Sequence, residues 1–504
     1  MRRFDEIVVG SGISGMTLAL LLGLNGRSVL LLEKSSQIGG SMARFYRNGI
    51  PFDTGFHFTG GFYKSGILHD MLTALGIQDL IRPIYVGGPG SNRFVFEEEE
   101  KDFDLPAGYQ ATIACLKEYF PADARAIDRY FEMVESVCRR TAGMDLRRIS
   151  FLPPFLDEDY VTLTEVLDRL TENRILKGLL AGFSMCHGVK PAEISFANHS
   201  RVSYGLHESV ARVEGGGDAF IQAFRKRSAD LDIEVMPATQ ITECVDVKNR
   251  RAGRFVLNNG DEVSCERCIF TIHPQEILKV LPRKHLSKAF AERVTEFEPS
   301  VGMFSLFGVV DENDSSVDRE EEFAPSIFSL FPTSDLNTLI DPSSSGDQAL
   351  VIMRSLEKAG GKAYQVVNAC EVSFVERFQR WRNSRRGKRP AEYLEYKEER
   401  AERIRERIVS AYPEYRDSYK VMDAASPLTF RDYLNSPDGS AYGVKQKIGQ
   451  FNVFGRLPLR NTYAAGQSAL LPGLVGAMMS SFVLGKKLLE QEDYGSFMKQ
   501  RLGS

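Results

Sequence analysis

The sequence predicts an α/β protein with a Rossmann-type dinucleotide-binding domain, and three observations lead to this fold class. A β-branched run, Ile7-Val8-Val9, is followed at once by the glycine pattern of residues 10–15. A second apolar run, Val29 to Leu32, ends at an acidic residue. Near the C-terminus, Asn461 to Ala465 is a third short strand pattern, and it also leads through glycines into a helix. Continuous apolar runs of this kind are typical of buried parallel strands.

The first glycine pattern reads Gly10-Ser11-Gly12-Ile13-Ser14-Gly15, and each glycine has a physical reason. Gly10 allows the tight turn, Gly12 lets the backbone approach a diphosphate, and Gly15 lets the helix pack on the sheet. The helix that follows presents free N–H groups, including those of Ile13 and Ser14, and a positive dipole end to the phosphates. The order of strand, glycine turn, helix, strand and acid makes this pattern specific.

The helix is expected to run from Ile13 to Asn25, with Gly26 just beyond its C-terminus. The second strand ends at Glu33, whose carboxylate can accept hydrogen bonds from ribose hydroxyls. A carboxylate at this position disfavours a 2′-phosphate, so NADP is not expected here. The turn alone leaves FAD and NAD open.

Composition excludes several other classes of protein. The chain has 504 residues, 63 basic and 67 acidic, and 43% are hydrophobic. This balance argues against disorder and offers no basic excess for nucleic acid. The seven scattered cysteines do not suggest a disulfide framework, and Cys265 and Cys268 have no second pair at zinc spacing, so no metal site is expected. We expect a reducing, cytoplasmic location.

The N-terminus superficially resembles a signal peptide, because Arg2 and Arg3 precede an apolar stretch. Asp5 and Glu6 and the three glycines of the turn interrupt that pattern, and no cleavage site follows. No apolar run of about 18 residues occurs, so no membrane-spanning helix is expected.

The residues after Glu33 point to the cofactor. Lys34 is followed by Ile38-Gly39-Gly40-Ser41 and then Arg44. This segment resembles the glycine-pair motif of the flavin amine-oxidase and phytoene-desaturase superfamily, which implies FAD and further backbone amides at the same diphosphate. The stretch Phe52 to Phe58 resembles the family segment beside the flavin ring, which implies contacts from Gly55, Phe56 and His57.

The C-terminal pattern contains Gly466-Gln467 and then Pro472-Gly473-Leu474-Val475-Gly476-Ala477, which opens a helix to about Leu489. It is similar to the closing flavin motif of phytoene desaturases, carotenoid isomerases and retinol-saturase-like proteins. The resemblance implies that the helix N-terminus faces the flavin's pyrimidine end, and that Gly466, Gln467 and residues 473–476 contact the flavin. Both ends of the chain are then expected at one cofactor.

The middle of the chain also resembles this family. Gly215-Gly216-Gly217-Asp218 leads into an expected helix from Ala219 to Ala229, followed by a strand from Ile233 to Met236. The resemblance implies that backbone near Ile241 holds the adenine. A turn near Gly260 and a strand from Cys268 to Ile272 complete the block.

We expect two discontinuous domains. Residues 1–81, 211–289 and 433–504 form the FAD-binding domain, and residues 82–210 and 290–432 form an α+β substrate domain on a mixed sheet with a helical cap. Phe304 to Val310, Ser326 to Phe331 and Leu350 to Ser355 are expected strands of that sheet. Glu371 to Tyr412 is charged and expected to be mostly helical, with a break near Gly387 and Pro390. The basic cluster before the break is expected to be a solvated face, or else a patch for anionic lipid headgroups.

The resemblance implies an FAD-dependent oxidoreductase that saturates or desaturates a carbon–carbon bond of an isoprenoid or polyene lipid by hydride exchange. His57 and Tyr442, the latter in a Gly-Ser-Ala-Tyr-Gly element similar to saturase-like members, are candidate catalytic residues beside structural roles. A polyene cis/trans isomerase and an amine oxidase are the alternatives, and a lipid carrier that shares the fold without flavin is a third class. A hydrophobic substrate, an electron donor or acceptor and peripheral membrane contact are the expected partners.

Overall fold

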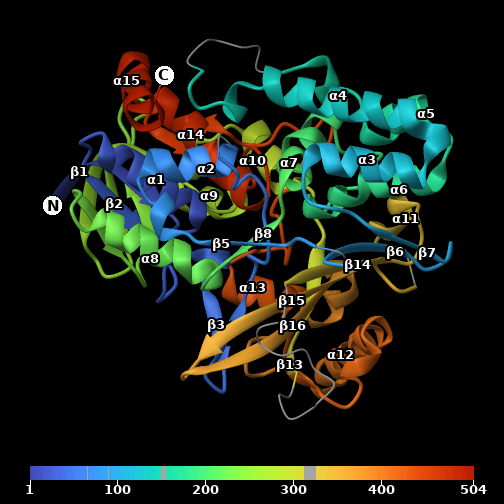
Figure 1. Ribbon diagram of the computed structural model, residues 1–504. Helices are drawn as coiled ribbons and strands as arrows, with labels where there is room; N and C mark the ends of the chain where they lie inside the picture. The colour runs from blue at the N-terminus through green and yellow to red at the C-terminus, as the bar shows by residue number, and fades with distance from the viewer. Residues whose placement is uncertain (65, 89, 149–154, 311–324, 345, 504) are drawn as a thin grey trace.

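The structure is a computed structural model that describes residues 1–64, 66–88, 90–148, 155–310, 325–344 and 346–503. Figure 1 shows two main sheets: one near the N-terminus, covered by α1, α8 and α14, and a second one beside α12. The helices span Ile13–Leu24 (α1), Ile67–Leu75 (α2), Tyr109–Tyr119 (α3), Ala124–Arg140 (α4), Leu163–Leu170 (α5), Arg174–Ala181 (α6), Phe196–Glu208 (α7), Gly216–Ser228 (α8), Pro274–Val280 (α9), Lys288–Thr295 (α10), Leu336–Leu339 (α11), Ala391–Ala411 (α12), Pro427–Tyr433 (α13), Gly473–Leu488 (α14) and Gln491–Leu502 (α15).

The first sheet contains a five-stranded parallel core. Its spatial order is β19 (Thr462–Ala464), β12 (Glu262–Phe270), β1 (Arg2–Val9), β2 (Val29–Leu32) and β9 (Ile233–Met236). Antiparallel strands β10 (Ile241–Val245), β11 (Arg254–Leu257) and β18 (Gly455–Arg456) extend it. Because the core strands are parallel, their carboxyl ends meet at one edge, where ligands bind in open α/β sheets.

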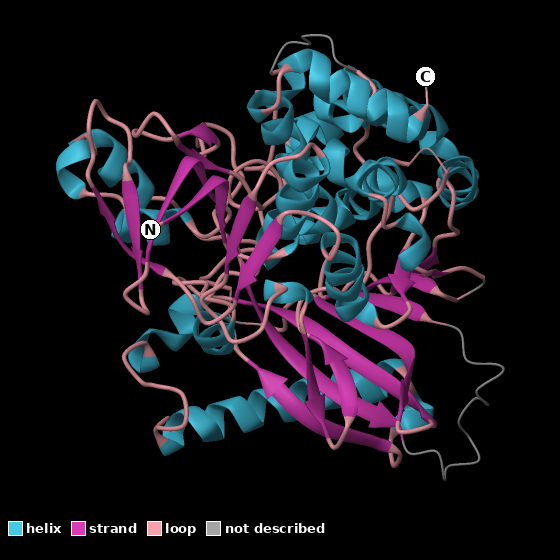
Figure 2. Cartoon of the chain, turned by 90° about the vertical axis from the view of Figure 1, so that its left-hand side faces the viewer, coloured by secondary structure: helices cyan, strands magenta, loops and turns pink. Residues whose placement is uncertain are grey.

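The second sheet is mixed. Its order is β17 (Tyr419–Ala425), β13 (Gly302–Val310), β16 (Lys362–Ser373), β15 (Leu350–Ala359), β14 (Ser326–Phe331), β6 (Asn92–Phe96) and β7 (Lys101–Asp104). Strands β14 and β6 run parallel, and the other pairs among the described strands of this sheet are antiparallel. Figure 2 shows α12 lying along one face of this sheet, while most other helices gather on the opposite side. The small ribbons are β3 (Arg44–Arg47) with β4 (Ile50–Asp53), and β5 (Pro83–Tyr85) with β8 (Ala211–Val213).

The predicted α/β fold with a Rossmann-type domain and a mixed second sheet is confirmed. Some local predictions were wrong. The helix expected over 371–412 is restricted to α12, because β16 continues to Ser373 and a 3₁₀ segment, Val375–Trp381, follows it. The charged Glu371 is tolerated inside the strand, since Arg400 and Arg407 pair with its buried carboxylate. Helix α8 begins at Gly216, three residues earlier than expected.

No helix in the described part of the chain is both long enough and apolar enough to cross a bilayer.

Candidate active site

Two helices from opposite ends of the chain lie side by side at the carboxyl edge of the parallel sheet. Ser14 Oγ on α1 lies 2.7 Å from Ser481 Oγ on α14, and Ser481 Oγ also donates to the Ser14 carbonyl at 2.8 Å. Further along, Leu21 of α1 contacts α14 at Gly485. From the first contact to the second, the residue number rises on both helices. The helices therefore run parallel, and their positive N-terminal ends point the same way.

The two helices are offset along their axes. Gly473, the first residue of α14, precedes Ser481 by eight positions, so α14 begins about 12 Å beyond the level of Ser14. Neither helix has a side-chain cap or an acidic residue in its first turn. Their first N–H groups therefore have no intrahelical partner and suit an anionic or electron-rich ligand.

The glycines around the first helix differ in what they make room for. A Cβ on Gly15 would lie 1.9 Å from the Gly10 carbonyl oxygen, so Gly15 is needed for the packing of the turn itself. A Cβ on Gly12 would meet nothing within 4 Å, and the same is true of Gly473. The space at Gly12 and Gly473 is therefore open for a ligand, which fits a dinucleotide lying along both helix ends.

Glu33 ties the turn to the end of β2. Its carboxylate accepts hydrogen bonds from Ser11 N at 3.0 Å and Ser11 Oγ at 2.6 Å, and its other oxygen accepts from Ser35 N at 2.8 Å. The second glycine pair is brought against the first turn: Gly39 bridges to Gly12, and a Cβ on Gly40 would lie 3.2 Å from the Gly12 Cα.

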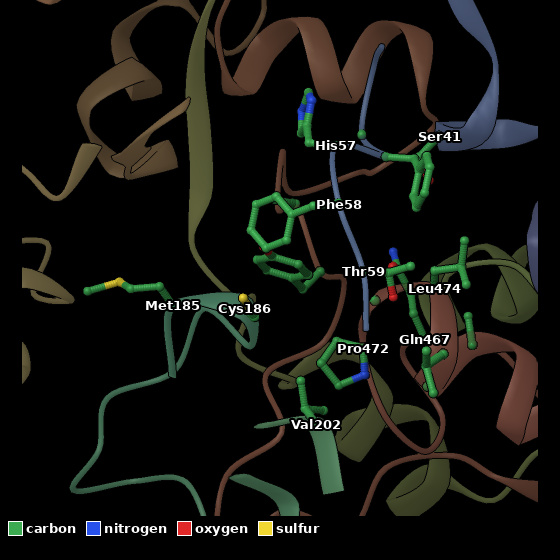
Figure 3. Close-up of a pocket in the computed structure, with 18 of the residues that line it drawn as sticks. Ser41, His57, Phe58, Thr59, Met185, Cys186, Val202, Gln467, Pro472 and Leu474 are labelled. Carbon is green, nitrogen blue, oxygen red and sulfur yellow. The ribbon is translucent and has the colours of Figure 1, made fainter. Parts of the chain in front are cut away.

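A mostly apolar cavity of about 230 Å³ opens beside these helix ends. Eleven of the expected site residues line it: Ile13, Ser41, Gly55, Phe56, His57, Tyr442, Gln467, Gly473, Leu474, Val475 and Gly476. In Figure 3, Ser41, Gln467 and Leu474 lie on one side of the cavity and Met185 and Cys186 on the other, with the Phe58 ring between them.

The other expected cofactor residues lie outside this cavity. Gly10, Gly12, Ser14, Gly15, Glu33, Gly39, Gly40 and Gly466 surround the carboxyl edge of the parallel sheet, Lys34 is exposed, and Ile241 begins β10. Arg44 is placed differently from the rest. It is buried with Asp53 and Glu357, at 3.0 and 2.6 Å.

The Arg44 cluster fixes the segment that carries His57. Arg212 donates to Asp53 at 2.7 Å, to Glu357 at 3.1 Å and to the carbonyl oxygen of His57 at 3.0 Å. Burial alone would raise the pKa of Asp53, but Arg212 and Arg44 hold that pKa below its ordinary value. Burial lowers the pKa of His57 to about 4, although Asp53 acts in the opposite direction, so the imidazole is neutral at pH 7.

Sequence reasoning missed the wall that the second sheet contributes. Met303, Ser305, Val351, Met353, Cys370 and Val372 line the cavity, as do Met185 and Cys186 from the segment after α6. The alternation of inward residues along β13, β15 and β16 was a usable signal, but it did not reveal which face meets the cofactor domain. Tyr442 lies at this end of the cavity, and burial raises the pKa of its phenol well above the usual value.

Comparison with known proteins gives three findings. A profile described as an NAD(P)-binding Rossmann-like domain matches residues 8–75. The chain is 25% identical to the all-trans-retinol 13,14-reductase of Danio rerio over 97% of its length and 86% of that protein. It is 30% identical to prolycopene isomerase 2 of an Oncidium hybrid cultivar, over 29% of this chain and 24% of that one.

The predicted resemblance is confirmed. The predicted enzyme class, an oxidoreductase, is confirmed with it. Among solved structures, cyclohexylamine oxidase from Brevibacterium oxydans has a TM-score of 0.60 over 99% of both chains at 14% identity, which supports the fold alone.

Proposed function

We propose that this chain is an FAD-dependent oxidoreductase that adds hydrogen to, or removes it from, a carbon–carbon bond of a polyene or isoprenoid lipid. The observation that carries the proposal is the apolar cavity beside two parallel, uncapped helix N-termini, with open space at Gly12 and Gly473. The likeness to a retinol reductase along nearly the whole chain supports the direction of saturation.

The expected cofactor residues fit FAD. The first-turn N–H groups of α1, next to the Gly39–Gly40 pair, would hold the diphosphate, and Glu33 would face the ribose. The N-terminus of α14, with Leu474 and Val475 at the cavity, would hold the flavin ring. FAD, when bound, supplies hydride exchange at its N5 atom. The protein would bind and orient the two reactants and exclude water from the cavity.

The character of the cavity favours an uncharged substrate over an amine. Among the described residues that line it, none is Asp or Glu. The single charged side chain is Arg201, whose guanidinium is already bound by Asp159 at 2.6 and 3.0 Å, by Thr141 and by Asn198. A cationic amine would therefore find no carboxylate, whereas a polyene needs none.

Two further proposals follow from the sequence. The discontinuous domain division, 1–81, 211–289 and 433–504 against 82–210 and 290–432, is supported by the strands that build each sheet. We also propose a cytoplasmic location with peripheral contact to anionic membranes, and the contact is supported by exposed Arg380, Arg382, Arg385, Arg386 and Lys388. Co-sedimentation with lipid vesicles tests the membrane contact: the protein should sediment with vesicles that contain anionic lipid and not with neutral ones.

The function is tested by anaerobic mixing of the reduced holo-protein with conjugated polyenes. Saturation predicts reappearance of the oxidised flavin spectrum and a product heavier by two hydrogens. A product of unchanged mass, with the flavin spectrum unaltered, would favour the non-redox isomerase, for which the similarity to prolycopene isomerase is the supporting observation. A colourless protein that does not take up FAD would favour the carrier.

A further inference from the structure

One polar pair interrupts an otherwise apolar wall of the cavity. Alternate residues of β13, β15 and β16 face the cavity, and within these described strands its lining is Met303, Ser305, Val351, Met353, Cys370 and Val372. Ser305 and Cys370 stand directly opposite each other across β13 and β16, with 3.4 Å between Oγ and Sγ. A thiol and a hydroxyl at this place are not required by the packing of an apolar sheet face.

His57 completes this pair from the other domain. Its Nε2 lies 3.6 Å from the Cys370 Sγ, and its Nδ1 is buried without a hydrogen-bond partner in the described structure. The carbonyl of His57 is fixed by Arg212. Cys370 and His57 are both only partly buried, because each lines the cavity. The thiol therefore lies between a hydroxyl, an imidazole and the space for the substrate.

The protonation states suit proton donation. Burial raises the pKa of the Cys370 thiol to about 11, only partly offset by Ser305. The thiol is protonated at neutral pH, and the neutral imidazole beside it can carry a proton in either direction. Cysteine is among the side chains that serve as general acids.

We propose that Cys370 is the acid that protonates the substrate carbon, and that His57 and Ser305 hold its thiol and return its proton. The inference rests on the proposed function. In saturation, Cys370 Sγ–H would give its proton to one carbon of the double bond, and FAD, when bound and reduced, would supply the hydride for the neighbouring carbon. Two C–H bonds would replace the π bond, and the two electrons would come from the reduced cofactor. The thiolate regains a proton from water through His57 or Ser305.

The first test measures the thiol–imidazole contact without turnover. The holo-protein is treated with iodoacetamide at one fixed pH, and alkylation of each cysteine is followed by peptide mass spectrometry. His57→Leu should slow alkylation of Cys370 about tenfold, because the thiolate loses one hydrogen bond. His57→Gln, which keeps an N–H of similar reach, should restore the rate to within about threefold.

Cys186 is the internal control, because it lines the same cavity, whereas the hydrogen-bond partner of His57 Nε2 among the described residues is Cys370. Its alkylation rate should be the same in all three proteins. An unchanged Cys370 rate in His57→Leu, or an equal change at both cysteines, would overturn the proposal.

The second test separates the proton step from the proposed function. Cys370→Ala should keep FAD affinity and reduction by dithionite, but should slow flavin reoxidation by the polyene at least about 100-fold. Cys370→Ser keeps a proton donor and fills a similar space, so its reoxidation rate should lie between those of the wild type and Cys370→Ala. Reoxidation of Cys370→Ala within threefold of the wild-type rate would overturn the proposal. Failure of wild-type protein to react with any polyene would instead refute the proposed function, while the alkylation result would still test the contact.

Discussion

Replacing Gly12 by alanine separates the folding of the turn from the binding of the cofactor. Gly12 has φ −62° and ψ 176°, an extended backbone that alanine adopts without strain. A Cβ at this position would contact nothing within 4 Å. The protein alone therefore gives no steric reason for glycine at this position, and the close approach of a ligand supplies one.

The magnitudes differ sharply for the two properties. The free energy of unfolding of the cofactor-free protein should change by less than about 1 kcal/mol, because alanine restricts the unfolded chain but is a poorer N-cap residue than glycine. The added methyl group should displace the diphosphate and cost at least one charge-assisted hydrogen bond, about 1.5–3 kcal/mol. The Kd for FAD should therefore rise by about 10- to 150-fold.

The assay combines urea unfolding of the cofactor-free protein with titration of FAD by fluorescence quenching. Gly87→Ala is the matched control, because a Cβ there also meets nothing within 4 Å and Gly87 does not line the cavity. Its Kd for FAD should equal that of the wild type. Equal FAD affinity in Gly12→Ala, or marked destabilisation of its cofactor-free form, would refute the reasoning.

Three further outcomes are expected. Gly15→Ala should lower the thermal unfolding midpoint of the cofactor-free protein, since its Cβ would lie 1.9 Å from a backbone oxygen; an unchanged midpoint would contradict the packing described. Asp53→Asn should destabilise the protein by about 3–5 kcal/mol in urea unfolding, because it leaves two buried arginines, Arg44 and Arg212, sharing the single carboxylate of Glu357; a loss below 1 kcal/mol would contradict this. Acid should also destabilise the protein, because the folded state keeps its buried histidines neutral while the unfolded state protonates them below about pH 6.5. Each such histidine should lower the free energy of unfolding by about 1.4 kcal/mol for each pH unit between pH 6 and 4. Burial lowers the pKa to about 3 in three of them, His187, His199 and His207. In urea titrations of a His199→Phe variant, the slope of the unfolding free energy against pH should be smaller by the equivalent of one proton.

Much of the fold could be predicted because its determinants are local. The β1–α1–β2 unit is set by an apolar run, a glycine turn and a second apolar run within 33 residues, so the sequence predicts both its elements and its order. Helix α14 was predicted to within one residue for the same reason.

The second sheet was harder to predict, because its pairings join distant segments. Strand β14 pairs with β6, more than 200 residues earlier, and the buried Glu371 made a strand resemble a charged helix. The contact between His57 and Cys370 spans 313 residues, so no spacing rule could reveal it. For Arg44 the local motif predicted a cofactor contact. In the structure its guanidinium instead pairs with the buried carboxylates of Asp53 and Glu357.

The central claim is that both ends of the chain hold one flavin. Hydrogen exchange of the backbone amides, measured with and without FAD, tests it most directly. FAD should protect the amides of residues 12–16 and of residues 473–477 together, with the same dependence on FAD concentration. Protection at only one of these helix ends, or two different concentration dependences, would contradict the claim.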